Sequence, residues 1–153
     1  MKITTFEDIK AWQASRVLAK MVYDAVKSNR DSSNDYKFRE QIQSAAVSIM
    51  SNIAEGFSRR TTKEFIQFLF IAKGSAAEVQ SQLYVALDQR YVNEEKFKEL
   101  YSKSDEAARL LSGFIRYLLN KDKPQEFKDL NKLNEPKELK QLKELERCEV
   151  KEG

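Results

Sequence analysis

Residues 61–90, TTKEFIQFLFIAKGSAAEVQSQLYVALDQR, decide the fold class. Thr61 followed by Glu64 is a capping box, the pattern in which two side chains satisfy free backbone N–H groups at a helix start. From about Thr62 to about Arg90, apolar residues recur at helical spacing on one face. The stretch therefore predicts one long amphipathic helix. Its apolar face comprises Phe65, Leu69, Ala72, Ala76, Val79, Leu83 and Leu87.

The same helix carries a second apolar set, Ile66, Phe70, Ala77 and Tyr84, about 100–140° from the first. A helix of a monomeric bundle needs only one apolar face. Burying one large apolar side chain contributes about 1.5–3 kcal/mol, so leaving several in water favours association. We expect a subunit interface here; the alternative is a wide core in which both faces contact neighbouring helices.

Three further helices are predicted around this one. The first runs from about Phe6 to Lys27, and the polar residues 29–34 after it predict a loop. The second runs from about Asp35 to Glu55, and the fourth begins after Asn93 as its cap. Because short loops make consecutive helices antiparallel neighbours, we expect an all-α, up-down-up-down four-helix bundle over residues 1–121.

Residues 122–153 form a separate charged tail in this interpretation. Pro136, followed by Leu139, Leu142 and Leu145, favours a short amphipathic helix. The tail is either frayed or a docking helix for a partner or a neighbouring subunit.

The composition suits a globular intracellular protein. Hydrophobic residues make up 41% and charged residues 33%. We find no apolar stretch long enough for a membrane span and no signal-peptide pattern. The single cysteine, Cys148, cannot form an internal disulfide, so a reducing compartment, the cytoplasm, is expected.

Catalytic chemistry has little support in the sequence. There is no histidine, which removes the commonest general base and most zinc sites. Lys73-Gly74-Ser75 has the wrong order for a phosphate loop, and we expect Gly74 to mark a close contact between helices. Carboxylates such as Glu55 and Glu64 are more typical of structural roles. We therefore predict a non-enzymatic protein without metal or cofactor.

A basic corner is predicted between the second and third helices. Arg59 and Arg60 lie in the loop and Lys63 in the first turn after it, where helix N–H groups add positive potential. Lys37 and Arg39 lie at the opposite end of the second helix and form a separate patch. The corner is either a phosphate-binding site or an ordinary solvated loop. The net charge of +3 is compatible with nucleic acid but not specific for it.

Asn52, Glu55 and Gly56 end the second predicted helix. Gly56 lies where a left-handed C-cap is expected. Asn52 lies beside the apolar face, and a buried amide needs hydrogen-bond partners. We expect it to bond the turn after Gly56 or the start of the next helix as a structural lock; a ligand contact is the alternative.

The segment from Gln41 to Gly56, with AAVSI and NIAEG, and the segment from Glu64 to Glu78, with AKGSAAE, resemble the bacterial family of 23S rRNA intervening-sequence proteins. Phe6, Trp12 and Tyr23 also match, and the resemblance covers about residues 5–120. It implies a four-helix bundle that assembles into a homopentameric ring and has no defined biochemical role. A similar family, the accessory proteins of diversity-generating retroelements, binds nucleic acid and a reverse transcriptase.

The sequence departs from the family pattern at Gln43 and Ser44, where members commonly carry arginines. Two functions stay open. The first is an oligomer that binds structured RNA or other nucleic acid through its repeated basic corners, which act together on one polyanion. The alternative is a protein-interaction scaffold or an accessory subunit, for example of a reverse transcriptase.

Overall fold

The computed structural model describes residues 2–121; Met1 and residues 122–153, with the helix predicted in the tail, lie outside the described part. The described chain is helical and contains no strand. A short 3₁₀ turn, η1 (Phe6–Asp8), comes first. It is followed by α1 (Lys10–Ser28), α2 (Arg30–Asn34), α3 (Tyr36–Phe57), α4 (Thr62–Asp88) and α5 (Glu94–Lys121).

The caps predicted for the later helices are present. Thr61 Oγ1 accepts the backbone N–H of Glu64 at 3.2 Å and donates to its carboxylate at 2.8 Å, so the predicted Thr61–Glu64 pair caps α4. Asn93 Oδ1 accepts the N–H of Lys96 at 2.8 Å at the start of α5. These side chains satisfy N–H groups that a helix cannot satisfy internally, which fixes where each helix begins.

The first predicted helix is interrupted, which corrects the prediction that it starts at Phe6. The Asp8 carboxylate accepts the N–H groups of Thr4 and Thr5 at 2.8 and 3.0 Å, which closes η1. Ile9 then adopts an extended backbone, with φ −77° and ψ 116°, and buries its side chain before α1 begins.

The predicted loop at residues 29–34 contains the short helix α2, a second correction. Asn29 caps it by accepting the N–H of Ser32 at 3.0 Å. The buried hydroxyl of Ser32 donates to the carbonyl of Val26 at 3.0 Å. Polar residues that suggest a loop therefore satisfy one another in a compact helical turn.

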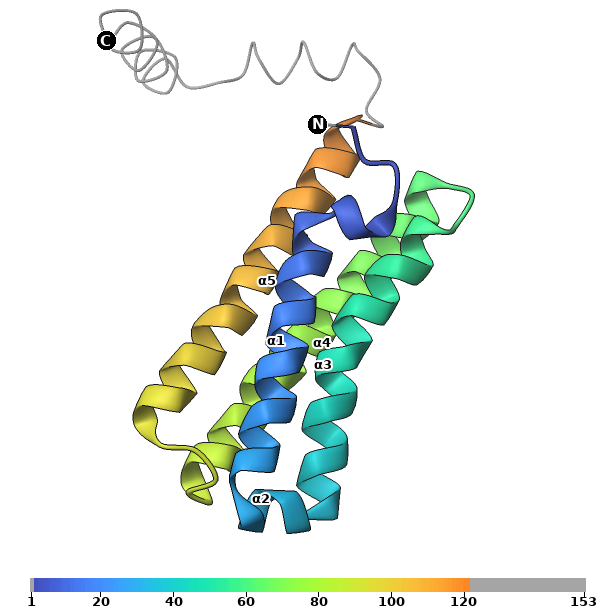
Figure 1. Ribbon diagram of the computed structural model, residues 1–153. Helices are drawn as coiled ribbons and strands as arrows, with labels where there is room; N and C mark the ends of the chain where they lie inside the picture. The colour runs from blue at the N-terminus through green and yellow to red at the C-terminus, as the bar shows by residue number, and fades with distance from the viewer. Residues whose placement is uncertain (1, 122–153) are drawn as a thin grey trace, which may run out of the picture. The chain divides into compact units, whose positions relative to one another are not determined.

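Two pairs of long helices pack antiparallel in a defined register. Between α3 and α4, Ser48 Oγ lies 3.0 Å from Ser75 Oγ, and Gln82 donates to Gln41 at 3.1 Å. Between α4 and α5, the rings of Phe65 and Phe114 lie 5.5 Å apart, and Ser104 donates to the carbonyl of Ala76 at 3.1 Å. Figure 1 shows α1 and α3 side by side in front, α5 beside α1, and α4 behind.

The core draws on all four long helices. The predicted face of α4 lies inward, with Leu69, Ala72, Ala76, Val79 and Leu83 buried and Phe65 and Leu87 partly buried. The other helices contribute the fully buried side chains Leu18, Val22, Ile49, Ile53, Leu100 and Leu111.

The roles predicted for Gly56 and Gly74 are both wrong. Gly56 lies inside α3, and no glycine of the described chain has a positive φ, so the predicted left-handed cap is wrong. A Cβ at position 56 would lie 2.6 Å from the Cβ of Phe68 and 2.8 Å from Cδ2 of Phe65, so Gly56 permits the close approach of α4. Gly74, predicted to be the close contact, has nothing within 4 Å of such a Cβ.

Candidate functional site: an apolar helix face and a basic corner

The outward face of α4 is apolar along much of its length. Phe70 is 52% exposed, Ile71 54%, Tyr84 52% and Val85 41%. Between these two pairs lie small exposed residues, Gly74, Ala77 and Ser81. A solvent-facing helix side normally carries charged residues, so this face is an interaction-surface candidate.

Ile66 does not belong to this face, which corrects the prediction that grouped it with Phe70 and Tyr84. Its side chain is 8% exposed and packs in the core. Tyr84 is also partly covered by its own chain. Its ring centroid lies 5.0 Å from that of Phe97 and 6.0 Å from that of Tyr101, both on α5. Phe70 and Tyr84 are equally exposed, and Phe70 has no aromatic neighbour of this kind among the aromatic pairs of residues 2–121.

Ile71 and Val85 belong to the exposed face and were missed by the sequence analysis. The spacing from Ile71 to Val85 equals that from Phe70 to Tyr84. Residues at this spacing lie at nearly the same angle around a helix, so Val85 lies below Ile71 as Tyr84 lies below Phe70. This equal spacing is the sequence signal from which Ile71 and Val85 could have been predicted. Ile71 and Val85 widen the face towards α3.

The predicted basic corner divides into one paired and two unpaired cations. Arg59 forms an ion pair with Glu55, with 2.6 Å between Nη2 and Oε1, and its guanidinium lies 4.7 Å from the ring centre of Phe68. Arg60 and Lys63 are exposed and form no ion pair within residues 2–121. Arg59 is exposed as well, so the lack of an ion pair in this part of the chain is what distinguishes Arg60 and Lys63, which lie at the positive end of α4.

The structure does not bring Lys37 and Arg39 to this corner. They lie at the start of α3, so most of the helix, about 30 Å at 1.5 Å per residue, separates them from Arg59. Arg39 donates to the carbonyl of Ser33 at 2.9 Å and lies 4.8 Å from the ring centre of Tyr36. Lys37 lines an open groove of about 450 Å³ together with Glu40 and Glu78, where the charge is mixed.

Asn52 has different partners from those predicted. Its amide donates to the carbonyl and to the hydroxyl of Ser48, at 2.8 and 3.0 Å, and the Ser48 hydroxyl contacts that of Ser75. Asn52 therefore does not bond the turn after Gly56. It bonds Ser48 within α3, and Ser48 in turn contacts Ser75 of α4. These bonds hold the Asn52 amide within the bundle, and its role as a structural lock stays a prediction.

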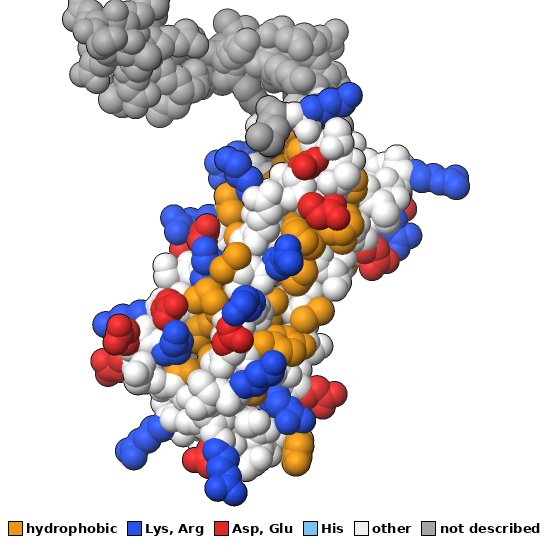
Figure 2. Space-filling model, viewed as in Figure 1, with side chains coloured by type: hydrophobic (Ala, Val, Ile, Leu, Met, Phe, Trp, Pro, Cys, Tyr) orange, Lys and Arg blue, Asp and Glu red, His pale blue; other side chains and the backbone are white. Residues whose placement is uncertain are grey.

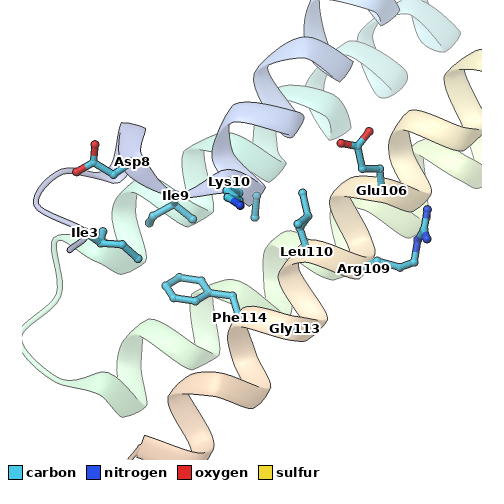
Figure 3. Close-up of a pocket in the computed structure, with 10 residues that line it drawn as sticks. Ile3, Asp8, Ile9, Lys10, Glu106, Arg109, Leu110, Gly113 and Phe114 are labelled. Atoms are coloured by element: carbon cyan, nitrogen blue, oxygen red, sulfur yellow. The ribbon is translucent and has the colours of Figure 1, made fainter. Parts of the chain in front are cut away.

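An apolar groove opens between the N-terminal segment and α5, with a volume of about 540 Å³. Figure 3 shows Ile3 and Ile9 on one wall and Leu110 and Phe114 on the other. Charged residues of both signs complete its lining: Asp8, Lys10, Glu106 and Arg109.

Figure 2 shows the face of the bundle formed by α1, α3 and α5, where cationic and anionic side chains are interspersed with apolar patches. No local sequence pattern indicates the groove, because its walls come from opposite ends of the described chain.

Two kinds of feature are absent from residues 2–121. That part of the chain contains no group of three or more His, Cys, Asp or Glu side chains placed to hold a metal ion. Among the helices of the same part, none combines the length and apolar character that crossing a bilayer requires.

The fold and these surfaces define a helical-bundle protein whose distinctive features are exposed faces. Residues 7–113 match the family model described as 23S rRNA-intervening sequence protein. The chain belongs to that family, as the resemblance of its NIAEG and AKGSAAE segments predicted.

A solved structure of similar fold is a protein of unknown function from the S23 ribosomal protein family of Bacteroides thetaiotaomicron VPI-5482. It is 24% identical, with a TM-score of 0.64, and the match covers 69% of this chain and 97% of that chain. No curated protein matches this chain. The similarity in structure supports the helical fold, and neither the family nor the solved structure carries a defined activity.

Proposed function

We propose that this protein is a non-enzymatic subunit of a homo-oligomer that binds the phosphate backbone of structured RNA. The observation that carries the proposal is the pair of exposed cations, Arg60 and Lys63, at the start of α4 with no anionic partner in the described chain. Two such cations bind phosphate weakly. In an oligomer each subunit presents one corner, so several weak contacts act together on one polyanion.

The apolar face of α4 supports the oligomeric part. Exposed patches of this kind are typical of interaction sites, and Phe70 and Ile71 are both more than half exposed on this face. The ring of five subunits that the family resemblance implies is the assembly we propose.

Binding of RNA measured against salt concentration tests the RNA-binding part. The double variant Arg60→Glu/Lys63→Glu should weaken binding and reduce the slope of log K against log[salt] by roughly one for each phosphate contact removed. The matched control is Lys27→Glu/Lys98→Glu, which changes the same charge at exposed positions away from the α3–α4 turn. Equal losses in both variants would reduce the effect to net charge and reject the corner as the site.

A protein-interaction scaffold is the second candidate, because the apolar α4 face suits a protein partner better than a phosphate backbone. A pull-down that compares the full-length protein with a version ending at Asn120 tests whether residues 121–153 help to hold such a partner. Retained RNA binding with loss of a protein partner would favour a scaffold role for residues 121–153.

A further inference from the structure

The groove between η1–α1 and α5 is a preformed apolar recess. Ile3, Ile9, Leu110 and Phe114 surround an opening of about 540 Å³ (Figure 3). A recess of this size accommodates one or two large side chains, and apolar linings favour apolar occupants. The described chain itself places nothing in it.

The same chain carries a pair of projecting apolar side chains on another side of the bundle. Phe70 and Ile71 are both more than half exposed, on the face of α4 that points away from the core. Each protomer therefore presents both a recess and the kind of group that fills it.

The two features lie at the same level along the bundle. Phe65 packs on Phe114, and Ala76 accepts a hydrogen bond from Ser104, which sets the antiparallel register of α4 and α5. Because the two helices are antiparallel, the residues of α4 that follow Phe65 lie level with the residues of α5 that precede Phe114. Phe70 therefore lies at about the height of Leu110 along the bundle axis. Phe70 is thus level with the middle of the groove.

One pair of opposite charges, Lys73 and Glu106, lies at that level, within a groove lining that also carries Lys10 and Arg109. Lys73 lies about one turn after Phe70, and Glu106 lies about one turn before Leu110 on the antiparallel helix. If α4 of one protomer runs antiparallel to α5 of another with Phe70 beside Leu110, Lys73 lies level with Glu106. Lys73 forms no ion pair within residues 2–121, whereas Glu106 pairs with Lys103 while remaining partly exposed.

From these relationships we propose that the α1–α5 groove of one protomer receives Phe70 and Ile71 of a second copy of this chain. The inference rests on the oligomeric part of the proposed function and assigns its interface. The contact is heterologous, because the two surfaces lie on different parts of the protomer. Since both lie at one level, successive subunits add without an axial shift, which a closed ring requires.

Cross-linking tests the contact directly. Gln67 and Gly113 are both exposed and lie at matching levels. Gln67 lies about one turn before the projecting pair, and Gly113 lines the groove. In a Cys148→Ser background, Gln67→Cys and Gly113→Cys in one chain should give a ladder of disulfide-linked multimers on oxidation, and each single variant should give none. A strong dimer from Gln67→Cys alone would indicate that α4 packs against itself and would overturn the proposal.

Subunit mixing provides a second test that leaves the fold intact. A Cβ at Gly113 meets nothing within 4 Å, so Gly113→Glu fills the groove with little cost to the protomer. Gly113→Glu and Phe70→Glu should each be monomeric, and an equimolar mixture should form a dimer through its one intact contact. The control Ser102→Glu, at an exposed position on α5, should keep the wild-type mass.

The outcomes separate this inference from the proposed function. A wild-type monomer rejects both the oligomer and the contact. A wild-type oligomer that persists in Gly113→Glu and shows no cross-linked ladder rejects the contact alone.

Discussion

Gly56 of α3 lies directly against Phe68 of α4, where a Cβ at position 56 would come within 2.6 Å of the Cβ of Phe68. The contact brings the two helix backbones together next to the basic corner. It explains why a residue without a side chain occupies a buried position in the last turn of α3.

The first prediction compares the two helical glycines. Gly56→Ala should destabilise the protein by about 1–3 kcal/mol, since α3 and α4 must separate to admit the methyl group. Gly74→Ala should stabilise it by about 0.5–1 kcal/mol, because the position is open and alanine favours a helix. Urea unfolding of both variants measures the difference; equal effects of the same sign would contradict the assigned contact.

The second prediction concerns pH and the Asp35–Tyr91 bond. The Asp35 carboxylate accepts the N–H of Phe38 at 3.0 Å and the hydroxyl of Tyr91 at 2.8 Å, and these bonds, the Phe38 bond first, lower the pKa of Asp35 below its ordinary value. A carboxyl whose folded pKa is depressed stabilises the protein above its unfolded pKa, about 3.9, and loses that contribution as pH falls through the folded pKa.

Asp35→Asn should therefore lower Tm at pH 7, and the difference from wild type should shrink as pH falls below about 4. Tyr91→Phe keeps the ring, whose centroid lies 5.0 Å from that of Phe38, and removes only the hydroxyl bond. Its Tm should fall less than that of Asp35→Asn. A Tm difference that does not change with pH would show that Asp35 acts without its charge.

The third prediction tests the lock within the bundle. Asn52→Ala removes the two hydrogen bonds to Ser48 and should cost about 1–2 kcal/mol, at about 1 kcal/mol or less for each bond. The control Ser51→Ala changes an exposed neighbour on α3 and should have little effect. Denaturant unfolding measures both. If RNA binding falls in Asn52→Ala while stability does not, Asn52 is a ligand contact instead.

The fourth prediction concerns the paired cation of the basic corner. Glu55→Gln frees Arg59 from its ion pair and removes one negative charge, so RNA binding should strengthen at low salt. Glu99→Gln is a matched control, because it breaks the Lys96–Glu99 pair in the first turns of α5 with the same change in net charge. Equal strengthening in both variants would mean that net charge alone controls binding.

The sequence predicted those parts of the fold that depend on local chemistry. The capping residues Thr61 and Asn93 and the inward face from Phe65 to Leu87 follow from spacing within one segment. Arg59 and Glu55 have the spacing of neighbouring side chains on a helix. Their ion pair could therefore have been predicted from spacing within one segment, although it was not.

The remaining features depend on contacts between segments far apart in the chain. Ile66 and Tyr84 lie at the same angle on α4, yet only Ile66 is buried, because the neighbouring helices cover that side differently at each level. The roles of Gly56 and Gly74 depend in the same way on where α3 and α4 approach each other. The groove combines Ile3 and Ile9 with Leu110 and Phe114, so no local pattern indicates it.

The molar mass of the full-length protein at tens of micromolar, measured by light scattering during size-exclusion chromatography, tests self-association through the exposed α4 face most directly. The account predicts a single species at a multiple of 17.8 kDa in the wild type and 17.8 kDa in Phe70→Glu. A wild-type mass of 17.8 kDa would contradict it, because Phe70 and Ile71 would then remain exposed to water without a partner.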